Sequence, residues 1–183
     1  MNFLHILFAV FVFVIPPAMG AEVGGTLDVT FTAESTLHRF EGHANGIPYV
    51  ARSPADRDQW SAEIVLPVES LTTENRLRDH NMRAMFDVEN YPRIVAALRD
   101  VRPDGDSRQA GKLDAIEFQL TIDGVTRHVR AAISDWHRAG GEVRFDASFT
   151  VSLHEFGLVP PSVLFVKVAD TVAVVVHVRG VDR

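Results

Sequence analysis

The clearest indication of the fold class of this chain is the segment IEFQLTIDGVTRHVRAAI, residues 116–133. Residues 116–122 alternate apolar with polar side chains, which is the pattern of a β-strand with one dry face and one wet face. Asp123-Gly124 follows, a dipeptide typical of a two-residue hairpin turn, and the chain then runs back from Val125. The stretch therefore predicts an antiparallel β-hairpin.

The same period of two continues along most of the chain and is longest and strictest over residues 143–153. We read Gly24-Gly25 and Gly140-Gly141 as turns. Predicted strands lie at residues 26–32, 36–47, 59–68, 93–101, 116–122, 125–133, 143–153 and 171–178. The last of them, TVAVVVHV, is apolar on both faces, so we expect a loop or a partner subunit to cover its outer side.

About eight antiparallel strands favour a closed barrel, because closure removes exposed sheet edges. The fold class expected is mainly β: an eight-stranded antiparallel barrel with one helical insertion. The interior of a barrel of this size is either filled by side chains or holds one small ligand. Since the inward face is apolar, any cavity would be apolar as well.

The helical insertion is predicted within SLTTENRLRDHNMRAMFDVENYPRI, residues 70–94. We expect Thr72 or Thr73 to cap its N-terminus and Tyr91-Pro92 to end it, since the residue before a proline avoids the helical region. Met82, Met85 and Phe86 follow a spacing of three and four residues and so form one apolar patch. This patch either covers an open barrel mouth or plugs a filled core, and we favour the plug.

The insertion also holds the polar residues that most resemble catalytic groups, Asn75, Arg78, Asp79 and His80. Adjacent residues of a helix point in different directions, so Arg78, Asp79 and His80 do not form one compact site. We interpret Asn75, Arg78 and Asp79 as a face that seats the helix on the barrel. No GxSxG elbow or glycine-rich phosphate loop occurs, and we predict no catalytic residues and no enzymatic activity.

The composition and charge of the chain limit the kinds of ligand and partner that it is expected to bind. The histidines are dispersed and the chain has no cysteine, so we predict no metal site and no cofactor. The net charge is −6 and the arginines are scattered, which argues against nucleic acid. The histidines considered are His38, His43, His80, His128, His137, His154 and His177.

The N-terminus resembles a secretory signal peptide. Residues 3–15 are apolar apart from His5, Pro16-Pro17 ends the run, and Ala18-Met19-Gly20 supplies small residues before a cut ahead of Ala21. We therefore expect a signal peptide at residues 1–20, a single domain at residues 21–183, and a periplasmic or secreted location.

Several motifs in order resemble the YceI-like family. They are Val68-x-Ser70-Leu71-x-Thr73-x-Asn75-x-x-Arg78-Asp79-x-x-Met82 with Phe86 and Tyr91-Pro92-x-Ile94, then Phe31 to His38 with Gly42, Leu120-Thr121-Ile122-x-Gly124-Val125-Thr126, and Glu155-Phe156-Gly157-Leu158. The resemblance implies a lipocalin-like barrel and an exported protein that binds polyisoprenoids. It also implies an isoprenoid lipid or isoprenoid quinone as partner, and is compatible with a homodimer and with transient contact with a membrane or membrane redox proteins.

The leading hypothesis is thus a non-enzymatic carrier or sequestering protein for a long apolar isoprenoid lipid. The alternative is a structural or interaction protein whose barrel is filled by its own side chains, and a hydrolase-type enzyme comes third. The residues expected to contact the lipid are Phe118, Leu120, Ile122, Phe145, Phe149, Val151, Val174 and Val176, with Met82, Met85 and Phe86 near a mouth.

Overall fold

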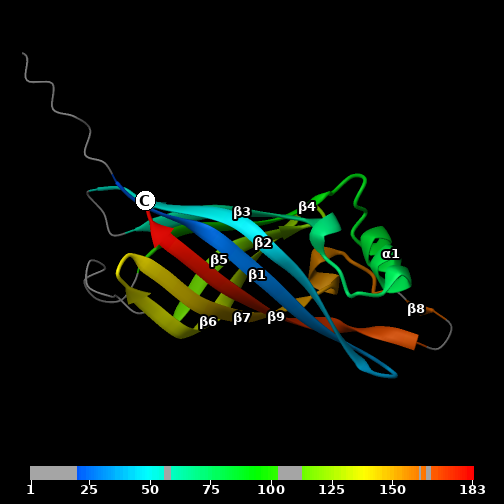
Figure 1. The fold of residues 1–183 in the computed structure, drawn as a ribbon. Coiled ribbons are helices and arrows are strands. Elements are labelled where there is room, and N and C mark those ends of the chain that lie inside the picture. Colours follow the sequence, from blue (N-terminus) through cyan, green and yellow to red (C-terminus); the bar gives the residue numbers. More distant parts are fainter. Residues whose placement is uncertain (1–19, 56–58, 103–112, 161, 164–165) are drawn as a thin grey trace, which may run out of the picture.

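The computed structural model describes residues 20–55, 59–102, 113–160, 162–163 and 166–183. Its elements, shown in Figure 1, are β1 (Ala21–Ser35), β2 (Arg39–Ser53), β3 (Trp60–Pro67), η1 (Val68–Ser70), α1 (Arg76–Met85), β4 (Arg93–Val101), β5 (Ala115–Ile122), β6 (Val125–Ala139), β7 (Glu142–Ser152), η3 (His154–Phe156), β8 (Ser162–Val163) and β9 (Val166–Asp182). The predicted signal peptide falls on residues 1–19 and Gly20, and residues 1–19 lie outside the described part of the chain.

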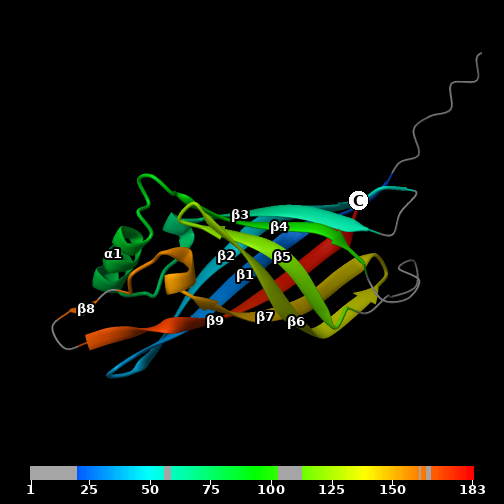
Figure 2. The ribbon, with the colours of Figure 1, turned by 180° about the vertical axis from the view of Figure 1, so that it is seen from behind.

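The strands form one antiparallel sheet in the order β1-β2-β3-β4-β5-β6-β7-β9-β8. Strand β1 also pairs with β9, so the sheet closes on itself, and β8 is a two-residue strand that pairs only with β9. Figures 1 and 2 show the resulting barrel from opposite sides, with α1 at one end and the C-terminus at the other. The prediction of an eight-stranded antiparallel barrel with one helix is confirmed.

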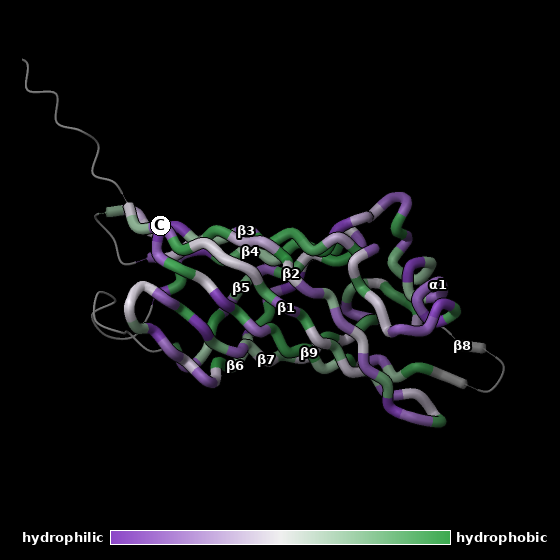
Figure 3. Tube along the Cα trace, viewed as in Figure 1, coloured by the Kyte–Doolittle hydropathy of each residue, from purple (hydrophilic) through white to green (hydrophobic). Residues whose placement is uncertain are grey.

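The predicted hairpin is present between β5 and β6. Asp123 and Gly124 both have positive φ, 51° and 73°, as a type I′ turn requires. Along β5 the inward residues are buried from Ile116 to Ile122, and the polar residues between them are more exposed. Figure 3 shows apolar and polar residues interspersed along many of the barrel strands.

The interpretation of Gly24-Gly25 as a turn was wrong, because both residues lie inside β1. Gly25 pairs with Tyr49 on one side and with Gly180 on the other. A Cβ atom on Gly25 would collide with the backbone of Arg179, so this glycine permits the close approach that closes the barrel. The turn at Gly140-Gly141 is confirmed, with φ values of 60° and 81°.

The termini of the helix also differ from the prediction. Asn75 caps α1, since its Oδ1 accepts a hydrogen bond of 3.1 Å from the Arg78 amide. The helix ends at Met85, six residues before Tyr91, because Asp87 adopts a left-handed φ of 44°. The Asp87 and Val88 amides donate to the carbonyls of Ala84 and Arg83, which is a Schellman motif. In the described part of the chain, no helix is long and apolar enough to cross a membrane.

Candidate ligand-binding cavity

The barrel encloses a cavity of about 910 Å³ that runs from α1 to the opposite end. All eleven residues expected to contact a ligand lie on its wall: Met82, Met85, Phe86, Phe118, Leu120, Ile122, Phe145, Phe149, Val151, Val174 and Val176. The rings of Phe118 and Phe149 meet edge to face with centroids 5.4 Å apart, which joins the walls formed by β5 and β7. The phenylalanines line the cavity and leave its centre open. This contradicts the alternative hypothesis of a barrel filled by its own side chains.

The final strand uses one apolar face for this wall. Val172, Val174, Val176 and Val178 line the cavity, whereas Ala173 is exposed on the outer face. On the same outer face, His177 Nδ1 lies 2.7 Å from Asp146 Oδ1 of β7. The strand is therefore dry on the inside and only partly apolar on the outside.

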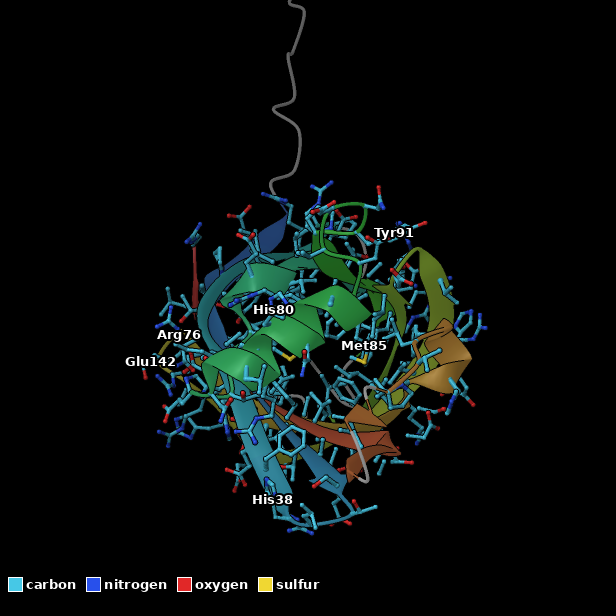
Figure 4. The ribbon with its side chains drawn as sticks, turned by 90° about the vertical axis from the view of Figure 1, so that its right-hand side faces the viewer. His38, Arg76, His80, Met85, Tyr91 and Glu142 are labelled. Atoms are coloured by element: carbon cyan, nitrogen blue, oxygen red, sulfur yellow. The ribbon has the colours of Figure 1, made fainter. Side chains whose placement is uncertain are left out.

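Helix α1 lies across one end of the barrel, which we call the α1 end (Figure 4). Met82 and Phe86 are buried, Met85 is half-buried, and all three side chains line the cavity instead of filling it. Our preference for a plug was wrong: the patch covers the end of a hollow barrel. Sequence periodicity identifies an apolar helix face but not whether space remains beneath it.

Asp79 seats the helix. Its Oδ1 accepts hydrogen bonds from the amide and hydroxyl of Thr73, at 2.7 and 2.5 Å, and its Oδ2 accepts one of 2.8 Å from the Thr72 hydroxyl. The Thr72 backbone pairs in turn with His43 of β2, so these bonds tie α1 to the barrel wall. Burial alone raises the pKa of Asp79, but these bonds and the nearby Arg83 charge outweigh it and hold the pKa below its usual 3.8.

The neighbours of Asp79 point elsewhere, as predicted. The Arg78 guanidinium lies 4.5 Å above the Phe40 ring on the cavity wall, and its Nη2 donates 3.1 Å to the Thr73 carbonyl. His80 is exposed. The acid, the cation and the imidazole thus occupy three different environments, which is unsuited to general acid–base catalysis by the three together.

The opposite end of the cavity, which we call the far end, contains residues that sequence reasoning missed. Trp60, Ser61, Trp136 and Arg138 line the wall there. The Trp136 ring stacks on Phe145 at 5.2 Å.

The Arg138 guanidinium lies 5.6 Å from the Trp60 ring centroid and 3.2 Å from Asp182 Oδ1. The predicted alternation in β6 stops at Ile133, and the register shifts between Ser134 and His137, where Asp135 has a φ of 53°. Because of this bulge, the inward-facing residues of β6 have odd numbers before it and even numbers after it. Strict alternation in the sequence therefore could not predict that Trp136 and Arg138 face the cavity.

Tyr49 adds one more polar group to the wall of the cavity. The side chain is 8% exposed, and burial raises the pKa of its phenol to about 12.

Among the described residues, no group of three His, Asp or Glu side chains is arranged to hold a metal ion. His154 resembles His177 in facing one carboxylate, with its Nδ1 2.6 Å from Asp170 Oδ1.

Solved structures share this architecture. Burkholderia cenocepacia BcnA is 19% identical with a TM-score of 0.63, over 84% of this chain and 95% of its own. A polyisoprenoid binding domain from Saccharophagus degradans is 12% identical with a TM-score of 0.62, over 90% and 99%. The Campylobacter jejuni YceI protein is 14% identical with a TM-score of 0.52, over 98% and 93%. At these identities the likeness shows the fold alone.

A comparison with curated protein sequences found no match. The model of the YceI-like domain, however, matches residues 20–179, which include all the strands of the barrel from β1 to β8 and most of β9. The motifs of the α1 segment, the closed barrel and this match agree, and the chain belongs to the YceI-like domain family.

Proposed function

We propose that this protein binds a long apolar isoprenoid lipid, a polyprenyl chain or the tail of an isoprenoid quinone, and carries or sequesters it without chemical change. The observation that carries the proposal is the cavity of about 910 Å³ with walls of aliphatic and aromatic side chains. Ligand cavities in proteins commonly have volumes of roughly 300–1,000 Å³. The similar domain from Saccharophagus degradans, described as polyisoprenoid binding, supports the choice of lipid.

Burial of the lipid supplies enough free energy for firm binding. Each methylene removed from water contributes about 0.8 kcal/mol, so about twenty such groups contribute on the order of 16 kcal/mol before opposing terms. Loss of rotational, translational and chain freedom offsets much of this gain. The remainder is sufficient for binding without covalent attachment, which agrees with a carrier.

Lipid exchange with a membrane is supported by the rim of the cavity at the α1 end. Leu37, at the β1–β2 hairpin, and Leu77, on α1, both line the cavity and are 72% and 69% exposed. Such apolar side chains at an opening are suited to contact with a bilayer from which an apolar ligand enters. The proposed setting is the periplasm or the extracellular space, reached after removal of residues 1–20.

Native mass spectrometry of the protein purified from its host tests the proposal. We expect a stoichiometric apolar passenger whose mass and fragments identify an isoprenoid, on a chain that begins at Ala21. A protein that is purified from its host without a bound lipid, and that stays empty after incubation with polyprenyl lipids, would contradict lipid carriage. A purified chain that still carries residues 1–20 would contradict export with cleavage of a signal peptide.

A further inference from the structure

The cavity is polar only near its two ends, and its charged side chains have one sign. Among the described residues that line it, no Asp, Glu or Lys is present, and the guanidinium groups are those of Arg78 at the α1 end and Arg138 at the far end. This is unexpected in a chain with a net charge of −6. Acidic side chains would repel an anionic ligand, whereas an arginine attracts one.

The two arginines are not equivalent. Arg138 is neutralised by Asp182, with Nη2 and Oδ1 3.2 Å apart, and its side chain is only 19% exposed. Arg78 faces no carboxylate in the described part of the chain, because the adjacent Asp79 is engaged by hydroxyl and amide groups of Thr72 and Thr73. Arg78 therefore brings an uncompensated positive charge to the cavity wall.

The guanidinium of Arg78 is also fixed in position with donors unused. Stacking over Phe40 at 4.5 Å and the 3.1 Å bond from Nη2 to Thr73 O define its plane. Its Nε–H is buried and has no hydrogen-bond partner. Asn81, one turn further along α1, lines the cavity beside it and offers an amide. A guanidinium held in a fixed plane on the cavity wall, with part of its hydrogen-bonding capacity unused, is suited to charge-assisted hydrogen bonding with a carboxylate or phosphate.

We propose that the cavity recognises amphiphiles with an anionic head group, a carboxylate or a phosphate, which Arg78 holds at the α1 end while the apolar tail extends toward Trp60 and Trp136. The inference rests on the proposed function, since it names the head group of the lipid that the cavity takes. It separates anionic isoprenoids from uncharged ones such as prenyl alcohols and quinones.

Three probes with one tail test the head group: geranylgeranyl phosphate, geranylgeranoic acid and geranylgeraniol. Isothermal titration of the delipidated protein gives the three affinities. We expect at least one anion to bind about tenfold or more tightly than the alcohol, because hydrogen bonds to charged groups are the stronger ones. The anion whose affinity exceeds that of the alcohol by the larger factor identifies the preferred head group, phosphate or carboxylate.

Variants locate the effect. In Arg78→Gln the ratio of the affinity for the anion to the affinity for geranylgeraniol should fall to about threefold or less, since about tenfold is the scale of one lost charge-assisted bond. Arg78→Lys, which keeps the charge but not the fork, should retain part of the preference. Arg76→Gln is the matched control, because Arg76 is exposed on the same helix and does not line the cavity.

The outcomes are distinct. Equal affinity of the wild-type protein for anions and alcohol overturns the head-group proposal whatever the variants do, and so does a full preference retained in Arg78→Gln. Loss of the preference in Arg76→Gln assigns it to general helix charge and also overturns it. Failure of all three probes to bind instead contradicts the proposed function.

Fluorescence tests the orientation, because the protein has two tryptophans and both line the far end. Bromine quenches tryptophan at short range, so 16-bromohexadecanoic acid should quench more strongly than 2-bromohexadecanoic acid at equal occupancy. Stronger quenching by the 2-bromo acid would place the head group at the far end and overturn the proposed orientation.

Discussion

At the scale of single residues, Asp79 is the carboxylate on which the position of α1 depends. It is 7% exposed and accepts three hydrogen bonds from Thr72 and Thr73. The Asp79→Ala variant leaves the buried Thr73 amide without its partner, so we expect the free energy of unfolding to fall by about 2 kcal/mol. Urea unfolding at pH 7 measures this, with the exposed Glu89→Ala as control.

The same bonds give this contribution a pH dependence. Because the pKa of Asp79 is lowered in the folded state, the unfolded chain takes up the proton first on acidification. The stability difference between wild type and Asp79→Ala should be full above the ordinary pKa of 3.8 and shrink as the pH falls below it. A difference that stays constant down to pH 2.5 would contradict the ionised, hydrogen-bonded state of Asp79.

Tyr49 should titrate late. The chain has two tyrosines, and removal of the exposed one in Tyr91→Phe leaves Tyr49 as the phenol observed near 295 nm. We expect a midpoint of about 12, since burial disfavours the phenolate. A raised pKa means that this contribution to stability is complete below pH 10 and is lost as the pH rises toward 12. A midpoint near 10 in the folded protein would show that the hydroxyl reaches water.

At the scale of elements, the closure between β1 and β9 depends on glycines. Gly180 pairs with Gly25, and a Cβ atom on Gly180 would approach Val23 Cγ1 to 2.8 Å and collide with the Tyr49 hydroxyl. Gly180→Ala should therefore lower stability by about 1–3 kcal/mol through overpacking. In a Tyr49→Phe background the loss should be smaller, since one of the colliding atoms is gone.

Chemical denaturation of the four proteins of this double-mutant cycle gives the coupling, which we expect to be at least about 0.5 kcal/mol. Gly46→Ala is the control: its φ is 69°, but nothing lies within 4 Å of a Cβ there, so only backbone strain is added. Additive effects of Gly180→Ala and Tyr49→Phe would contradict the contact.

For the molecule as a whole, a substitution that fills the cavity tests whether the lipid binds inside the barrel. Ala147 is buried on β7 and lines the cavity, so Ala147→Phe places a ring in open space. We expect lipid binding to weaken by at least about tenfold while the melting temperature is kept or raised, because filling a void adds contacts. Ala173→Phe on the exposed outer face of β9 is the matched control.

Titration of a geranylgeranyl probe and a thermal melt of both variants check this prediction. Unchanged binding in Ala147→Phe would mean that the ligand occupies another surface. If Ala147→Phe is unfolded while Ala173→Phe melts like the wild-type protein, the cavity next to β7 has no room for the added ring.

Alternation in the sequence was sufficient for the barrel, for the turn at Asp123-Gly124 and for the inward faces of β5 and β7, because period-two patterning directly encodes which side of a strand is dry. It was not sufficient for β9, whose residues 171–178 are apolar on both faces. It was also not sufficient where the parity changes, at the bulge near Asp135, or where a glycine serves close approach, as at Gly25. These features depend on strands far away in the chain.

Motif order and local spacing in the sequence were enough to predict the family, the eight antiparallel strands and the apolar inner face. The folded structure was needed to show that the barrel is hollow and that α1 covers an end of the cavity. It alone showed that Asp79 is engaged by threonines while Arg78 faces no carboxylate among the residues that the structure describes. Volume and charge compensation are properties of side chains brought together from distant strands, and no local pattern specifies them.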